Sequence, residues 1–276
     1  EAFARRCEVV RESLREAVNR YGWDGDWYLQ ATTDAGLLLG SAENEEGKIF
    51  LMPNIWAVIS GITDEERAQT AMASVTRHLL KDYGTLLNYP AFTRPRPDIG
   101  YVTRYAPGLR ENGGVYTHAA TWSVWAYTLV GQPELAYEAY RRICPPNRSA
   151  DIERYWAEPY VTPGNIDGPL SEYYGRAGWT WYTGSSQWLH RVATHWILGI
   201  RPQEDGLLVD PSIPAEWPGY RITRRFRNAV YEIDVRNPDG VSRGVRSATV
   251  DGQPLDGNLL PAFGDGKTHQ VEIIMG

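Results

Sequence analysis

Residues 178–199, with the sequence GWTWYTGSSQWLHRVATHWILG, separate two regions of different texture and decide how the rest of the chain is interpreted. Apolar side chains recur at helical spacing over residues 184–198. Gly199 stands just past the last of them, at the position where a helix favours a residue in the left-handed conformation. The stretch therefore predicts a helix that begins near Gly184 and ends before Gly199.

The two flanks of this helix predict different structure. On its N-terminal side, apolar periodicity predicts helices over residues 1–20, 54–60, 63–81, 117–130 and 133–143. Thr63 and Glu66 are expected to cap the third of them. On its C-terminal side, alternating runs between glycine-rich turns predict strands over residues 220–226, 229–235, 247–250 and 269–274. The chain is thus expected to be mainly α, part of an α/α toroid, with a C-terminal antiparallel β-sandwich.

Charge and composition exclude several classes of function. The net charge of −6 argues against a nucleic-acid partner, because phosphate backbones require a basic face. No apolar run approaches the roughly 18 residues of a membrane span. Histidines and cysteines form no metal-ligand spacing, and Cys7 and Cys144 are expected to be reduced, buried thiols. The 11 Trp and 17 Tyr against five Phe suit either sugar binding or a large helical core.

Four segments could carry chemistry. One, residues 176–182, places three aromatic side chains directly before Thr183 and suits a sugar next to a phosphate; the other three each have a structural alternative. The start of the helix at Thr183 and Gly184 could bind an anion through free backbone N–H groups, or Thr183 could be an ordinary cap. In residues 110–118, Glu111 could accept sugar hydroxyls and His118 could donate to an anion. Alternatively, Glu111 pairs with Arg110 or Arg104 and His118 bonds to backbone. The acidic loop at residues 40–48 could hold an acid or base, or could be solvated.

Read together, these motifs resemble the glycoside hydrolase family 94 phosphorylases, which include cellobiose, cellodextrin and chitobiose phosphorylases. The resemblance rests on residues 40–48 (GSAENEEGK), 56–61 (WAVISG), 105–108 (YAPG), 111–118 (ENGGVYTH), 158–160 (EPY), 178–185 (GWTWYTGS), 198–202 (LGIRP) and 205–211 (DGLLVDP). It extends over nearly the whole chain, in order and with matching spacing.

The resemblance implies a fold, a reaction and a set of site residues. Residues 1–203 would form the second half of an (α/α)6 catalytic barrel, and residues 204–276 a C-terminal β-sandwich. The reaction would be inverting phosphorolysis of a β-linked glucoside-type oligosaccharide to an α-sugar 1-phosphate, with inorganic phosphate as co-substrate and no cofactor or metal. Glu111 would hold the sugar in subsite −1, and Tyr105 would line subsite +1. The phosphate ligands would be His118, Thr183 and Gly184.

The chain also departs from the family pattern. The Asp-Trp-Asn-Asp-Gly type motif that carries the general acid is missing, so no catalytic residue is expected in this chain. The acid is expected upstream, in an N-terminal half of the same enzyme that is covalently joined or supplied as a separate chain. The complete enzyme is expected to be a bacterial, cytoplasmic homodimer, and the isolated chain to be inactive. The alternatives are a non-catalytic carbohydrate-binding or accessory chain and a fragment of an inverting (α/α)6 glycoside hydrolase.

Overall fold

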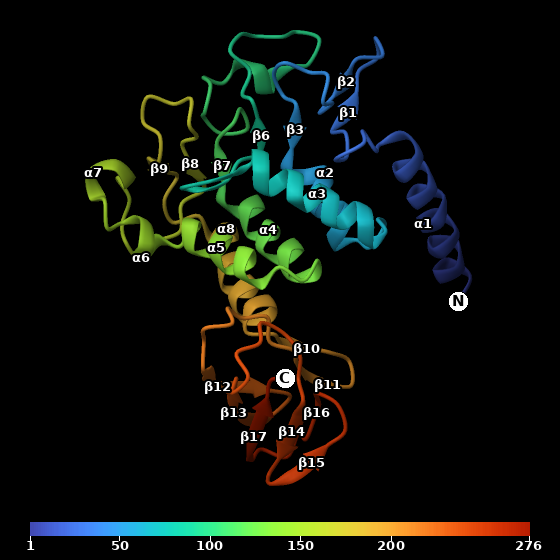
Figure 1. Cartoon of the computed structure of the whole chain (residues 1–276), viewed down its shortest axis with the longest axis vertical. Coiled ribbons are helices and arrows are strands. Elements are labelled where there is room, and N and C mark those ends of the chain that lie inside the picture. Colours follow the sequence, from blue (N-terminus) through green and yellow to red (C-terminus); the bar gives the residue numbers. More distant parts are fainter. The chain divides into compact units, whose positions relative to one another are not determined.

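The computed structural model describes residues 1–276, which divide into two compact units. The first unit comprises Glu1–Val130 and Ala139–Leu189, and the second comprises Gly131–Glu138 and His190–Gly276. Helices dominate the first unit and strands dominate the second, as the colours of Figure 1 let the reader follow. The structure thus contains a helical domain followed by a β domain. No helix is both long enough and apolar enough to cross a membrane.

Each predicted helical segment contains a helix, and two short helices, over residues 145–148 and 152–155, were not predicted. The helices are α1 (Ala2–Tyr21), α2 (Leu51–Ile59), α3 (Glu65–His78), α4 (Thr117–Leu129), α5 (Pro133–Ile143), α6 (Pro145–Arg148), α7 (Ile152–Tyr155) and α8 (Thr183–Arg191). A π-helical turn, η2 (Val192–Ile197), continues α8, and a 3-10 turn, η1 (Tyr101–Arg104), lies in the long loop before α4. In the first unit, α2 packs against both α3 and α4, and most of α4 is buried.

The start of α3 differs in detail from the prediction. Its N-cap is Asp64, whose side chain accepts a hydrogen bond of 2.8 Å from the backbone N–H of Arg67. Thr63, the predicted cap, instead lies outside the helix. Both residues carry an oxygen that can cap, and Asp64, which directly precedes the first helical residue, makes the bond.

The first helix is exposed over residues 2–17 and partly covered only at Val18 and Asn19. Its apolar stripe includes Phe3, which is 78% exposed, and Leu14, which is 58% exposed, and the helix has no buried residue. The prediction that Cys7 is buried is therefore wrong, because Cys7 lies on this exposed helix; Cys144 is half-buried. Amphipathic periodicity indicates that a helix has an apolar face, but it does not predict whether another segment of the same chain covers that face.

Short strands organise the loops of the first unit. Three of its sheets have two strands each: β1 (Ala31–Thr32) with β2 (Leu38–Leu39), β3 (Ile49–Phe50) with β6 (Asn88–Tyr89), and β4 (Leu80–Lys81) with β5 (Gly84–Thr85). A fourth sheet has the order β7 (Val115–Tyr116), β8 (Asn165–Ile166), β9 (Ala177–Gly178). The long loop over residues 83–116 is therefore ordered by pairing with distant segments of the chain.

The second unit contains a three-stranded and a five-stranded sheet. The three-stranded sheet has the order β10 (Ile200–Pro202), β11 (Gly206–Val209), β16 (Leu259–Pro261). The five-stranded sheet has the order β12 (Gly219–Phe226), β13 (Ala229–Arg236), β17 (Thr268–Ile274), β14 (Ser247–Val250), β15 (Gln253–Leu255). All pairs are antiparallel except β13 with β17, which is parallel. The prediction of a purely antiparallel domain is wrong at this pair, because the chain crosses over through β14–β16 before β17 joins β13.

Gly199 ends the helix as the sequence predicts, and the structure shows why a glycine is needed there. Its φ is +72°, and a Cβ at this position would lie 1.9 Å from the backbone oxygen of Asp210. We expect Gly199→Ala to lower the free energy of unfolding by about 1–2 kcal/mol for the left-handed backbone and by roughly 1–3 kcal/mol more for the clash.

Gly252→Ala is the matched control for this prediction. Gly252 has a similar φ of +76°, but nothing lies within 4 Å of an added Cβ. Urea unfolding of both variants measures the difference. Equal losses of stability in the two variants would contradict the clash at Gly199.

Candidate functional site

The small sheet β7-β8-β9 brings two helix starts together. Both β7 and β9 pair antiparallel with the central strand β8, so β7 and β9 run in the same direction. Their C-terminal ends therefore lie at the same edge of the sheet. Strand β7 leads directly into α4, which begins at Thr117, and β9 leads through Trp179 and Tyr182 into α8, which begins at Thr183. The N-termini of α4 and α8 are thus presented side by side.

His118 and Gly184 are in contact at this junction. A Cβ on Gly184 would lie 3.2 Å from Nδ1 of His118 and 3.5 Å from its Cε1. The absence of a side chain at Gly184 thus leaves the edge of the imidazole open to the start of α8. Thr183, the first residue of α8, is exposed. The structure brings together the three residues that the sequence suggested for an anion.

Several polar atoms at the two helix starts are buried and have no hydrogen-bond partner within the chain. They are Oγ1 of Thr117, Nε2 of His118 and Oγ of Ser185. Buried polar atoms are almost always paired, so a group of unpaired ones at one place indicates a missing ligand or water. The first backbone N–H groups of a helix also lack partners and carry partial positive charge, which favours an anion.

Aromatic rings fix the position of His118. Its imidazole lies edge-on to Trp122, with ring centroids 4.7 Å apart, and 6.1 Å from the ring of Trp188. Trp122 and Trp188 also contact each other, at 5.6 Å. Because Trp122 belongs to α4 and Trp188 to α8, this cluster holds the two helix starts in a fixed relation. Composition alone left sugar binding and core packing as alternatives, and these two tryptophans are half-buried and pack against His118 and each other.

Burial shifts the pKa values of His118 and of the neighbouring Tyr116. Burial lowers the pKa of the imidazole below its usual value of 6.5, so His118 is neutral at pH 7 and donates from one nitrogen. The hydroxyls of Tyr116 and Tyr182 are 3.3 Å apart. Burial, assisted by this hydrogen bond and by the charges of Tyr182 and Glu111, raises the pKa of Tyr116 to about 12. The Tyr116 phenol therefore stays protonated and can act as a donor.

Tyr105 and Glu111 lie around the guanidinium of Arg110, which the sequence suggested only as a partner for Glu111. The guanidinium carbon of Arg110 is 4.7 Å from the ring centroid of Tyr105 and 4.1 Å from that of Trp179. Nε of Arg110 is 3.9 Å from the carboxylate of Glu111, which stays half-exposed. The stack joins the loop before α4 to the segment that enters α8. The structural alternative for Glu111, pairing with Arg110, is thus present, but it leaves the carboxylate accessible.

Hydrogen bonds from the buried side chain of Asn112 fix the conformation of this loop. Its buried amide accepts a hydrogen bond of 2.7 Å from the N–H of Phe92 and donates bonds of 2.8 Å to the carbonyls of Phe92 and Tyr105. Asn88 adds a bond of 2.7 Å from the N–H of Gly113. Arg110 itself has a φ of +53°, a strained conformation for a non-glycine residue. The loop is therefore positioned by specific buried contacts.

The acidic loop at residues 40–48 has a structural role in this chain. The carboxylate of Glu46 accepts hydrogen bonds from the N–H and the hydroxyl of Thr93, at 3.0 and 2.5 Å. Glu43 and Glu45 are exposed. These contacts favour the interpretation of the segment as a solvated loop that ties down its neighbour, and they give no group the environment of a general acid.

Comparisons with known proteins agree with the motif pattern. A sequence model described as the glycosyl hydrolase 94 superfamily, catalytic domain, matches residues 1–199. An N,N'-diacetylchitobiose phosphorylase of Vibrio proteolyticus is 40% identical over 266 residues, which cover 96% of this chain and 33% of that protein. A solabiose phosphorylase of Paenibacillus borealis is 35% identical over 275 residues, covering 100% of this chain and 36% of that protein.

A third relative is much longer than these. A cyclic beta-(1,2)-glucan synthase of Rhizobium meliloti is 41% identical over 231 residues, which cover 81% of this chain and 8% of that protein. The chain spans about a third of the length of the two curated phosphorylases that it matches.

Proposed function

The chain belongs to the glycosyl hydrolase 94 superfamily, and from this membership we propose that it forms the phosphate site and part of the sugar subsites of an inverting glycoside phosphorylase. The observation that carries the proposal is the contact between His118 and Gly184 at two adjoining helix starts. The relatives at 40% and 35% identity are named as disaccharide phosphorylases, which supports the same reaction class.

Inorganic phosphate would bind between the starts of α4 and α8. The imidazole of His118, the hydroxyl of Thr183 and the backbone N–H of Gly184 supply donors of the kind that a phosphate anion accepts. The unpaired Nε2 of His118 and Oγ of Ser185 support this placement, since a bound oxyanion and its waters would satisfy them.

The sugar would lie beside the phosphate, with Glu111 and Tyr105 around it. A half-exposed carboxylate can accept two hydroxyl hydrogen bonds from the ring in subsite −1, and the Tyr105 ring can contact the sugar in subsite +1. The Arg110 guanidinium between Tyr105 and Trp179 adds donors at the same edge. We assign Arg110 to this sugar site together with Tyr105.

The reaction would then be a single displacement. A phosphate oxygen forms a bond to the anomeric carbon while the bond from that carbon to the glycosidic oxygen breaks, and the product is an α-sugar 1-phosphate. The leaving oxygen takes a proton from an aspartic acid that lies outside this chain. Because phosphate is itself the nucleophile, no general base is required to activate water, as it is in an inverting hydrolase.

The remaining predictions of the sequence belong to the same proposal. Residues 1–203 would be the second half of an (α/α)6 barrel, residues 204–276 a β-sandwich, and the rest of the barrel would come from an N-terminal half of the enzyme. The complete enzyme would be a cytoplasmic homodimer that acts on a β-linked oligosaccharide and needs no cofactor. Sedimentation of the whole protein tests the dimer.

The phosphate requirement is the direct test of this function. We expect the whole protein to release sugar from a β-linked disaccharide only when phosphate is present, and to form one α-sugar 1-phosphate for each bond broken. Anion-exchange chromatography and proton NMR of the product measure both the yield and the anomer. Equal cleavage in phosphate-free buffer would reject phosphorolysis in favour of hydrolysis. No cleavage under either condition would favour an accessory sugar-binding chain.

A further inference from the structure

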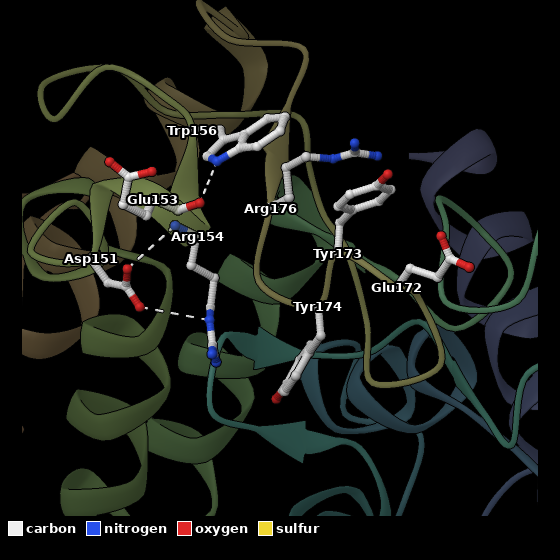
Figure 2. A pocket seen from close by; sticks show the side chains of 8 residues that line it. All are labelled: Asp151, Glu153, Arg154, Trp156, Glu172, Tyr173, Tyr174 and Arg176. Carbon is white, nitrogen blue, oxygen red and sulfur yellow. Dashed lines mark hydrogen bonds and ion pairs between the residues drawn. The ribbon is translucent and has the colours of Figure 1, made fainter.

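A cavity lies between α7 and the connection from β8 to β9. Its volume is about 480 Å³, within the roughly 300–1,000 Å³ of typical ligand pockets. Figure 2 shows the side chains that line it: Asp151, Glu153, Arg154, Trp156, Glu172, Tyr173, Tyr174 and Arg176. None of these residues belongs to the proposed phosphate and sugar site. The cavity therefore needs its own explanation.

Two aromatic rings on this cavity are open to solvent. Trp156 is 60% exposed and Tyr173 is 50% exposed. Their ring centroids are 6.2 Å apart and their planes are inclined by 42°. Large aromatic side chains are costly to leave in water, and neighbouring exposed ones mark binding surfaces. The pair offers flat apolar faces with polar edges.

The backbone at Trp156 presents the indole at an energetic cost. Trp156 ends α7 with a φ of +55° and a ψ of +25°, the left-handed region that glycine and asparagine favour. A bulky residue here is an outlier, and such strain clusters at ligand sites. The indole N–H donates to the carbonyl of Glu153, which fixes the ring by its edge. The guanidinium carbon of Arg176 lies 5.9 Å from the ring centroid.

The charges around the rings do not suit an anion. The guanidinium of Arg176 lies 4.3 Å from the Tyr173 ring and pairs with the buried carboxylate of Asp167 at 3.2 Å. Arg154 pairs with Asp151 at 3.6 Å. A carboxylate thus compensates the positive charge of each arginine. The carboxylates of Glu153 and Glu172 make no ion pair and would repel a phosphate. The cavity therefore offers carboxylate oxygens that can accept hydrogen bonds from hydroxyls, and N–H groups that can donate them, around the aromatic faces.

We propose that this cavity is a second carbohydrate-binding site, which takes one or two rings of a neutral oligosaccharide. A sugar ring has an apolar C–H face that stacks on Trp156 or Tyr173, and hydroxyls that bond to Glu153, Glu172 and Arg176. Arg176 directly precedes β9, which leads to the start of α8. The rings bound here come either from the distal end of the substrate or from a separate oligosaccharide.

Binding of tetrasaccharides to the protein tests this site. The probes are cellotetraose, laminaritetraose and chitotetraose, and saturation-transfer NMR and calorimetry measure their binding. We expect Trp156→Ala and Tyr173→Ala each to lower the affinity for the tightest-binding tetrasaccharide about ten-fold. This factor corresponds to the loss of roughly 1.4 kcal/mol of contact between the aromatic ring and the sugar. Trp156→Phe keeps a ring and should retain most of the affinity. Tyr21→Ala, at a tyrosine on α1 that is 69% exposed, is the matched control.

Circular dichroism melting verifies that each variant is folded. If Trp156→Ala does not fold, Tyr173→Ala alone tests the site. Glu111→Gln distinguishes the two sources of the sugar. Pocket binding that survives this change indicates a separate oligosaccharide, and binding that is lost with it indicates the distal end of the substrate. Unchanged affinity in both alanine variants, or no binding of any probe to the unaltered protein, would overturn the proposal. These outcomes do not depend on whether cleavage requires phosphate.

Discussion

Replacing His118 with alanine should raise the KM for inorganic phosphate while changing the KM for the sugar much less. The imidazole borders Gly184 at the proposed anion site, and its Nε2 has no partner within the chain. A hydrogen bond to a charged group contributes roughly 1.5–3 kcal/mol, which corresponds to about 10- to 100-fold in affinity. Initial rates of phosphorolysis by the whole protein, measured over a grid of phosphate and sugar concentrations, separate the two constants.

His190→Ala is the matched control, because it removes an exposed imidazole near the other end of α8. It should leave both constants unchanged. An unaltered phosphate KM in His118→Ala would remove His118 from the anion site.

The same residue predicts a pH dependence of phosphate binding. Burial lowers the pKa of His118 from its usual value of 6.5 in the free protein. Its contribution to stability is therefore present above pH 6.5 and is lost as the pH falls through the lowered pKa. A bound phosphate anion stabilises the imidazolium and raises this pKa, so binding near neutral pH should take up protons. Calorimetry in two buffers with different ionisation enthalpies measures the uptake, and His118→Ala should reduce it.

Replacing Asn112 with alanine should cause a large loss of stability. The change leaves the N–H and C=O of Phe92 and the C=O of Tyr105 without their partner in the interior. An unsatisfied buried group costs roughly 1–3 kcal/mol, so we expect the free energy of unfolding to fall by about 3 kcal/mol or more. Because Asn112 also positions Tyr105 and Glu111, the sugar KM should rise as well.

Urea unfolding measures this loss, with Asn147→Ala as the control. The Asn147 amide makes one exposed hydrogen bond of 3.2 Å to the carbonyl of Arg141, and its removal should change stability by less than about 0.5 kcal/mol. If the two variants lose equal stability, the loop before α4 is not held by the Asn112 amide.

The regular elements could be predicted because their signals are local. Helical periodicity located the helix that begins at Thr183, and Gly199 marked its end, where the structure has a φ of +72°. Alternation located β12 and β13. The π-helical turn η2 has no such signal, since a change from one hydrogen-bond spacing to the next leaves the apolar pattern almost unchanged. The parallel pairing of β13 with β17 also depends on contacts distant in sequence.

The residues of the site could be predicted only in part. The family resemblance placed His118 and Gly184 at one phosphate site, but the strands that bring them together have only two residues each. Strands of this length are too short for alternation to be recognised, so the residue pattern alone did not predict the sheet that joins the two helix starts. The stack of Tyr105, Arg110 and Trp179 was missed, because nothing in composition marks an arginine with a φ of +53°.

The central claim is that inorganic phosphate lies between the starts of α4 and α8. A crystal structure of the protein with bound phosphate and a β-linked disaccharide tests it most directly. The account predicts an anion within about 3.2 Å of a ring nitrogen of His118, the hydroxyl of Thr183 and the N–H of Gly184, with the sugar against Glu111. A phosphate bound elsewhere, with water at this junction and the sugar remote from Glu111, would contradict it.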